Sequence, residues 1–254
     1  MTHICAMQKT IRGVDEAGFL AAYDPTRYDP PSVTVDVVLL TVKGTDVHVL
    51  LGQRSNHPAK GAWGLPGGFV RSAESLDDAA ARVLAEKAGL RGIFIEQLYT
   101  FGAPQRDPRT RVISVAYYAL VDAETLATAV GRADPERLVV ARLAVSDERS
   151  PGTVAVLGEG GDPLRLAFDH ADIIGTAMQR IRGKLGYAPI GFELLPEEFT
   201  LRDLRLIHEA ILQRPINKDS FRRHILDQGL VHATGARATG VGHRPPELYR
   251  FATR

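Results

Sequence analysis

The stretch GLPGGFVRSAESLDDAAARVLAEKAGL, residues 64–90, decides the fold of this chain. A pair of glycines precedes an acidic residue, and a run of strong helix formers follows. Ser75 is a typical helix N-cap and Gly89 is a typical C-cap. Arg82 and Glu86 are four positions apart, so they share one face of the predicted helix. The stretch therefore predicts a glycine-rich loop followed by a helix that presents charged side chains to one site.

The spacing in this stretch resembles the Nudix box, G-x5-E-x7-R-E-U-x-E-E-x-G-U, where U is an apolar residue. The matching positions are Gly68, Glu74, Arg82, Leu84, Glu86, Gly89 and Leu90. Val83 and Lys87 stand where the pattern has glutamates. A Nudix enzyme holds Mg²⁺ or Mn²⁺ with these carboxylates and hydrolyses a diphosphate. Because Val83 cannot bind a cation and Lys87 repels one, we expect no catalytic residues and no metal site in a retained fold.

Residues around the box are candidates for binding a diphosphate without cutting it. Gly67 and Gly68 let the backbone approach a phosphate closely, and Lys87 supplies the positive charge that a metal supplies elsewhere. The loop FGAPQRDPRTR, residues 101–111, carries three arginines, which suit phosphate recognition; the alternative is a solvated charged loop. The predicted effector-binding residues are Arg54, Gly67, Gly68, Phe69, Glu74, Arg82, Glu86, Lys87, Arg106, Arg109 and Arg111.

Predicted strands flank the box on both sides. The segments VTVDVVLLTV (33–42) and HVLLGQ (48–53) are typical of a β-hairpin. Further strands are expected at 93–100, 112–121 and 138–145, with a short helix at 122–131. This order describes an α+β sandwich.

The last part of the chain has a different pattern. An amphipathic helix is expected at 169–185, and Thr200 caps a second one at 201–212. A turn, a helix at 218–228 and two short strands complete the order of a winged helix-turn-helix. The predicted organisation has four parts: a lead-in at 1–30, a nucleotide-sensing domain at 31–150, a linker at 151–168 that is rich in turn formers, and the connecting helix with the winged helix at 169–254.

Charge is concentrated at this end. From residue 214 onward eight Lys and Arg stand against three acids, an excess of five in a chain whose total net charge is +1. Basic residues at the start of a recognition helix suit the major groove, and a basic hairpin suits phosphates. The predicted DNA-binding residues are Asn217, Lys218, Ser220, Arg222, Arg223, Arg237, His243 and Arg244. The alternative is a winged helix used for protein contacts.

Composition excludes several classes of protein. At 254 residues with 44% hydrophobic content, the chain is typical of one large or two ordinary globular domains. A single cysteine rules out an intramolecular disulfide, and no apolar run approaches the roughly 18 residues of a membrane span. We therefore expect a cytoplasmic protein.

Several segments together resemble the Nudix-related transcriptional regulators of NAD metabolism, the NrtR family. The carriers are SVTVDVVLLTV (32–42), GLPGGFV (64–70), QLYTFGAPQRDPRTRVISVAYYAL (97–120), LAFDHADII (166–174), LLPEEFTLRDLRLIHEAIL (194–212), FRRHILDQGLV (221–231) and RPPELYRF (244–251). The resemblance implies an N-terminal Nudix α/β/α sandwich followed by a C-terminal winged helix-turn-helix. It also implies a dimeric bacterial repressor that senses ADP-ribose, or a related NAD-derived nucleotide, and binds a palindromic operator at NAD synthesis or salvage genes.

Two other functions stay open from the sequence. The first is an active ADP-ribose pyrophosphatase with an accessory dimerisation domain, for which Mg²⁺ would matter; Val83 and Lys87 count against it. The second is a protein-interaction adaptor, which a lack of binding at any salt concentration to DNA from the protein's own genomic neighbourhood would favour.

Overall fold

A computed structural model describes residues 15–132, 138–145, 154–186, 188–238 and 245–252 of the chain. The chain divides into two compact units, residues 1–31 and 32–254. In the first unit, helix α1 (Glu16–Ala22) is capped by Asp15 and is followed by a short 3₁₀ helix, η1 (Pro25–Arg27). Helix α1 buries none of its residues. No helix in the described ranges is both long and apolar enough to span a bilayer.

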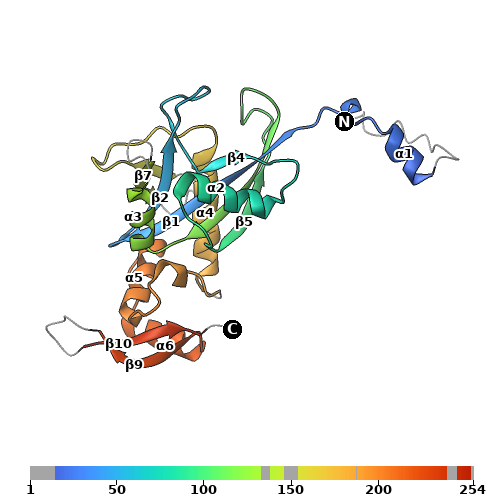
Figure 1. Cartoon of the computed structure of the whole chain (residues 1–254). Coiled ribbons are helices and arrows are strands. Elements are labelled where there is room, and N and C mark those ends of the chain that lie inside the picture. The colour runs from blue at the N-terminus through green and yellow to red at the C-terminus, as the bar shows by residue number, and fades with distance from the viewer. Residues whose placement is uncertain (1–14, 133–137, 146–153, 187, 239–244, 253–254) are drawn as a thin grey trace. The chain divides into compact units, whose positions relative to one another are not determined.

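The second unit is built on an eight-stranded sheet (Figure 1). Its strands are β1 (Ser32–Lys43), β2 (Asp46–Gln53), β3 (Trp63–Gly64), β4 (Gly67–Phe69), β5 (Ile95–Phe101), β6 (Val112–Leu120), β7 (Leu138–Val145) and β8 (Val154–Leu157). The order across the sheet is β5-β6-β1-β2-β7-β8, with β3 on β2 and β4 on β1. Strands β1 and β6 are parallel, and the other pairs are antiparallel.

Helices cover both faces of this sheet because β1 is apolar on both sides. Val37 and Leu39 pack into the cluster that contains α2 (Leu76–Ala88) and α3 (Ala123–Gly131). Side chains alternate along a strand, so Val38 and Leu40 join the opposite cluster with α4 (His170–Lys184). The predicted α/β/α sandwich is confirmed.

The segment 151–168, predicted as a linker, contributes strand β8 to the sheet, and the loop after β8 is hydrogen-bonded to β3. Strand β8 pairs with β7 at the sheet edge, and the backbone of Trp63 exchanges hydrogen bonds with Arg165 and Ala167 at 2.9 and 2.8 Å. Helix α4, grouped with the winged helix in the prediction, contributes buried residues such as Ile174 and Met178 to the sandwich core. The turn formers around β8 obscured its short alternating pattern, and the apolar face of α4 is covered by the sheet.

The winged helix-turn-helix follows a 3₁₀ turn, η2 (Phe192–Leu194). Helix α5 (Leu201–Leu212) begins with the predicted capping box between Thr200 and Asp203. Helix α6 (Lys218–Asp227) is followed by the hairpin of β9 (Val231–Arg237) and β10 (Glu247–Phe251), whose strands are longer than predicted. Its core contains the buried residues Phe199, Leu201, Leu204, Phe221, Ile225, Val231 and Tyr249.

His208 makes the stability of this domain depend on pH. It is buried on α5 with its ring edge-on to Phe221 at 5.1 Å. Burial lowers the pKa of His208 from 6.5 to about 4. Between these values the unfolded chain binds more protons than the folded chain, so the stabilisation is complete above pH 6.5 and lost as the pH falls toward 4.

The free energy of unfolding should fall on acidification in the wild type, because His208 binds a proton when the chain unfolds. In His208→Gln we expect this fall to be smaller by up to about 3 kcal/mol. Urea unfolding of both proteins at pH 7.5 and at pH 4.5 measures this difference. As the control, the exposed His232 is replaced with Gln in the same way, which leaves the buried His208 and its contribution to the pH dependence in place. Equal pH dependence in the wild type and His208→Gln would contradict the expectation.

Candidate functional site

Two adjoining cavities open beside the glycine-rich loop. The first measures about 560 Å³ and the second about 220 Å³. Arg54, Leu65 and Gly67 line both. Their combined size is in the range of small-molecule and cofactor pockets.

Gly67 brings the backbone of β4 against β1, where it pairs with Asp36. A Cβ atom at position 67 would lie 2.2 Å from Oδ1 of Asp36 and 3.0 Å from the carbonyl oxygen of Val35. Glycine is therefore required there by the close approach. Gly67 was predicted to let the backbone approach a phosphate closely. In the structure the group that it approaches is the buried carboxylate of Asp36, which the sequence did not reveal.

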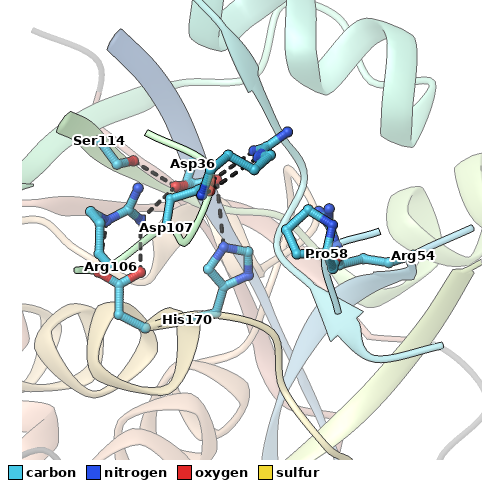
Figure 2. A network of polar contacts seen from close by, with 9 residues as sticks. Asp36, Arg54, Pro58, Arg106, Asp107, Ser114 and His170 are labelled. Atoms are coloured by element: carbon cyan, nitrogen blue, oxygen red, sulfur yellow. Dashed lines mark hydrogen bonds and ion pairs between the residues drawn. The ribbon is translucent and has the colours of Figure 1, made fainter. Parts of the chain in front are cut away.

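Asp36 is the centre of a buried polar network (Figure 2). Its Oδ2 accepts a hydrogen bond from Ser114 Oγ at 2.5 Å and lies 3.5 Å from Nη2 of Arg106. The guanidinium of Arg106 also donates two hydrogen bonds to Asp169, at 2.8 and 2.7 Å. The Arg106 side chain is 5% exposed. Two carboxylates thus share one buried guanidinium.

His170 is neutral in this network. Its Nδ1 accepts a hydrogen bond from the backbone N–H of Leu65 at 2.9 Å, so its proton is on Nε2. Nε2 faces Oδ1 of Asp36 at 3.8 Å. Burial lowers the pKa of His170 below its ordinary value, although the carboxylate of Asp36 acts in the opposite direction. The ring therefore orients the loop at Leu65 without adding charge.

Two arginine–aromatic pairs line the second cavity. The guanidinium of Arg54 lies over the ring of Phe168, 4.7 Å from its centroid, and that of Arg109 lies 5.5 Å from the centroid of Phe69. Arg109 is held by Asp107 through hydrogen bonds of 3.0 and 2.7 Å. Cationic planes on aromatic rings give a surface suited to a base or sugar joined to phosphate.

The charged residues of the box helix bind one another. Arg82 donates to both oxygens of Glu74, at 2.8 and 2.6 Å, and lies 3.3 Å from Glu86. The hydrogen bonds from Arg82 lower the pKa of Glu74 to about 2. Val83 is buried in the core, and Lys87 is exposed and lines the first cavity.

These donors do not fit a divalent cation. Glu86 is shared between Arg82 and Arg71, each at 3.3 Å, and Glu74 is bound by Arg82. Within the described part of the chain, no three His, Cys, Asp or Glu side chains gather in a way that could hold a metal ion. A hard cation prefers several free oxygen ligands, which this helix does not offer.

The structure brings most of the predicted effector-binding residues to the cavities. The cavity-lining ones are Arg54, Gly67, Gly68, Phe69, Glu86, Lys87, Arg106 and Arg109. Glu74 and Arg82 instead join the loop to the helix, and Arg111 donates to the carbonyl of Ala103 at 3.1 Å. The three arginines of the loop 101–111 therefore do not form one exposed cluster, because Arg106 is buried.

Sequence reasoning missed several residues of the second cavity and of the network that supports it. The cavity is lined by Asp36, Asp107, His170 and the aromatic Phe168, and Ser114 and Asp169 complete the network. One signal was available, because Asp36 is the lone acid in a strand whose middle residues are apolar and buried on both faces. Such a carboxylate needs partners, but their positions far along the chain are set by the tertiary fold.

The winged helix presents a basic surface. Helix α6 buries Phe221 and Ile225 and leaves the predicted residues Asn217, Lys218, Ser220, Arg222 and Arg223 exposed. Asn217 caps the helix by accepting from the backbone N–H groups of Asp219 and Ser220. Arg237 is exposed at the end of β9, and its guanidinium donates to the carbonyl of Pro245 at 3.0 Å. His243 and Arg244 lie outside the described residues.

The fold and the site define a class: a Nudix domain with a nucleotide-sized pocket, joined to a winged helix domain. Comparison with known families agrees with this. The NUDIX domain model matches residues 30–149, and the model of the NrtR DNA-binding winged helix domain matches residues 191–251. The chain belongs to the NrtR family, so the resemblance found in the sequence is confirmed.

Relatives extend over nearly the whole chain. It is 34% identical over 239 residues to the ADPR-responsive transcriptional repressor NtrR of Acinetobacter baylyi, covering 93% of this chain and 88% of that protein. Its fold is similar to that of Shewanella oneidensis NrtR complexed with a 27mer DNA, with a TM-score of 0.70, 36% identity, and coverage of 87% and 93%. A MutT/nudix family protein from Enterococcus faecalis gives a TM-score of 0.74 at 30% identity, covering 95% of each chain.

Proposed function

We propose that this chain is an ADP-ribose-responsive transcriptional repressor. One observation carries the proposal: a single chain combines a nucleotide-sized pocket with an exposed basic helix in a winged helix domain. The carboxylates beside the pocket are bound by arginines and are not arranged to hold a metal ion. The relative from Acinetobacter baylyi, described as ADPR-responsive, supports ADP-ribose as the effector. The Shewanella oneidensis relative bound to DNA supports an operator as the partner.

The two cavities suit the shape of ADP-ribose, which carries a nucleoside at one end of a diphosphate and a ribose at the other. We place the diphosphate where the cavities join, beside Arg54, Gly67 and Lys87. The arginine–aromatic pairs of the second cavity then face one end of the ligand. In this arrangement the charge of Lys87 replaces that of a metal ion.

On the DNA, two protomers would each place α6 in a major groove. A homodimer with two-fold symmetry requires half-sites about one helical turn apart, which makes the operator palindromic. The proposed targets are genes of NAD synthesis or salvage, and the proposed place of action is the bacterial cytoplasm. Titrating ADP-ribose into a complex with a DNA duplex, selected from genomic DNA by the wild-type protein, tests the whole proposal. Release of DNA supports it, and DNA retention at saturating nucleotide contradicts it.

The second candidate function is ADP-ribose pyrophosphatase, which two retained box carboxylates, Glu74 and Glu86, favour. Their engagement by Arg82 counts against it. Incubation with ADP-ribose and Mg²⁺, followed by chromatography of AMP, distinguishes the two. A kcat of about 1 s⁻¹ or more, which is usual for enzymes, would establish the hydrolase.

Lys87 is the residue to test for metal-free binding. The substitution Lys87→Glu should lower the affinity for ADP-ribose by about tenfold or more without divalent cations, because it places a negative charge beside the diphosphate. Lys87→Arg should keep most of the affinity. The exposed Lys43 at the end of β1 gives a matched control, and Lys43→Glu should leave binding unchanged. Isothermal titration calorimetry measures all four proteins; an unaltered Kd in Lys87→Glu would refute this placement of the diphosphate.

A further inference from the structure

Helix α4 begins in a strained arrangement at the second cavity. Phe168, just before the helix, has φ of 51°, in the left-handed region that a bulky side chain rarely adopts. The same residue lines the cavity and lies under Arg54. Backbone strain of this kind persists where surrounding contacts enforce it, and it is frequent at switch regions.

The N-cap of α4 is also unusual. Asp169 occupies the N-cap position, but its side chain makes no capping hydrogen bond to the helix. Its two oxygens accept from Arg106 instead, at 2.8 and 2.7 Å. An aspartate at this position ordinarily accepts from the first free N–H groups of the helix. The carboxylate of Asp169 thus binds Arg106 and leaves the start of α4 without a side-chain cap.

Arg106 is the group for which a ligand would compete. Its buried guanidinium lines the second cavity and is shared between Asp169 and Asp36. A phosphate is a strong bidentate partner for a guanidinium. A diphosphate at the junction of the cavities would lie beside Gly67, whose strand partner Asp36 contacts Arg106. A phosphate oxygen that reached Arg106 from there would free Asp169 to cap α4 and would allow the strained turn at Phe168 to relax.

The other end of α4 contacts the winged helix. Arg182 Nε donates a hydrogen bond of 2.8 Å to the carbonyl oxygen of Ile211. Ile211 is in the last turn of α5, whose carbonyls lack partners within the helix. Ile207 and Ile211 also join the apolar cluster that contains Ile181 of α4. Helix α4 has 15 residues and is about 22 Å long, so it extends from the cavity to its contacts with the end of α5. The turn after α5 then leads into α6.

We infer that Asp169 and Arg182 are positioning residues that couple the two sites through α4. Occupancy of the second cavity changes the capping of α4 at Asp169, and Arg182 transmits the resulting shift of the helix to the end of α5 and the placement of α6. This coupling rests on the proposed function, because it assumes that ADP-ribose weakens DNA binding.

The test at the winged-helix end compares two arginines of one helix. Arg182→Ala removes the hydrogen bond to α5, whereas Arg180→Ala removes a similar 3.0 Å bond to the carbonyl of Leu98 in β5, within the Nudix domain. The readout is the ratio of the Kd for the selected duplex with saturating ADP-ribose to that without it. In Arg182→Ala this ratio should fall at least about fivefold toward one, whereas the Kd for ADP-ribose alone changes less than about threefold. Arg180→Ala and the conservative Arg182→Lys should keep most of the ratio.

The test at the cavity end uses Asp169→Asn, which weakens the pair with Arg106 and retains a residue that caps helices. Its affinity for the duplex without nucleotide should fall toward that of the wild type with ADP-ribose. If ADP-ribose weakened DNA binding by Arg182→Ala as much as by the wild type, the coupling through α4 would be overturned and the proposed function would stand. Wild-type DNA affinity in Asp169→Asn would have the same consequence. Absence of any ADP-ribose response in the wild type would overturn the proposed function, and the coupling with it.

Discussion

Replacing both Arg222 and Arg223 with alanine is expected to weaken binding to the selected DNA duplex by at least about 100-fold, because under the proposed function this pair contacts base edges and phosphates. Both side chains are exposed on α6, which buries Phe221 and Ile225. The guanidinium of Arg222 lies 3.4 Å from the hydroxyl of Tyr249 on the hairpin, which orients it at the junction of helix and wing.

Fluorescence anisotropy at several salt concentrations measures this effect. Each phosphate contact that is lost should also reduce the slope of log K against log salt by about one. ADP-ribose affinity should stay at the wild-type value, because the substitutions are in the winged helix. As a matched control, the exposed Arg91 and Arg132 of the Nudix domain are replaced together with alanine, which should leave DNA affinity unchanged. Equal DNA affinity in the α6 double variant would exclude α6 as the reading helix.

The substitution Gly67→Ala is expected to lower ADP-ribose affinity by about tenfold or more and to destabilise the protein by about 1–3 kcal/mol, because a methyl group cannot fit without displacing its neighbours. The new Cβ would lie 2.2 Å from Oδ1 of Asp36. Relief of this clash moves Asp36, and the hydrogen bond from Ser114 and the contact with Arg106 move with it.

Calorimetric titration and urea unfolding measure the two effects of Gly67→Ala separately. Gly131 is the control, since a Cβ there meets no atom within 4 Å. Gly131→Ala should leave ligand affinity unchanged. If Gly67→Ala were folded and bound ADP-ribose with wild-type affinity, the cavity beside Gly67 would not be the effector site.

Much of the architecture followed from local patterns. The apolar run of β1, the caps at Ser75 and Gly89, and the capping box at Thr200 are properties of neighbouring residues, and all three are present in the structure. The segment around β8 differed from its prediction, because four strand residues among turn formers carry little periodic signal. Pairing with β7 stabilises it, and such a partner is not readable from a local window.

The candidate site also has features that the sequence determined and features that only the tertiary structure decided. Sequence alone determined the frame of the Nudix box, the departures at Val83 and Lys87, and the basic helix with its exposed arginines, because these depend on spacing along the chain. Only the tertiary structure decided that Arg106 is buried between Asp36 and Asp169 instead of lying open on a loop. These three residues are up to 133 positions apart in sequence. A buried guanidinium must be paired with carboxylates, but the tertiary fold determines which carboxylates lie beside it. The physical reason is that spacing fixes which residues share one element, whereas packing fixes which elements share one site.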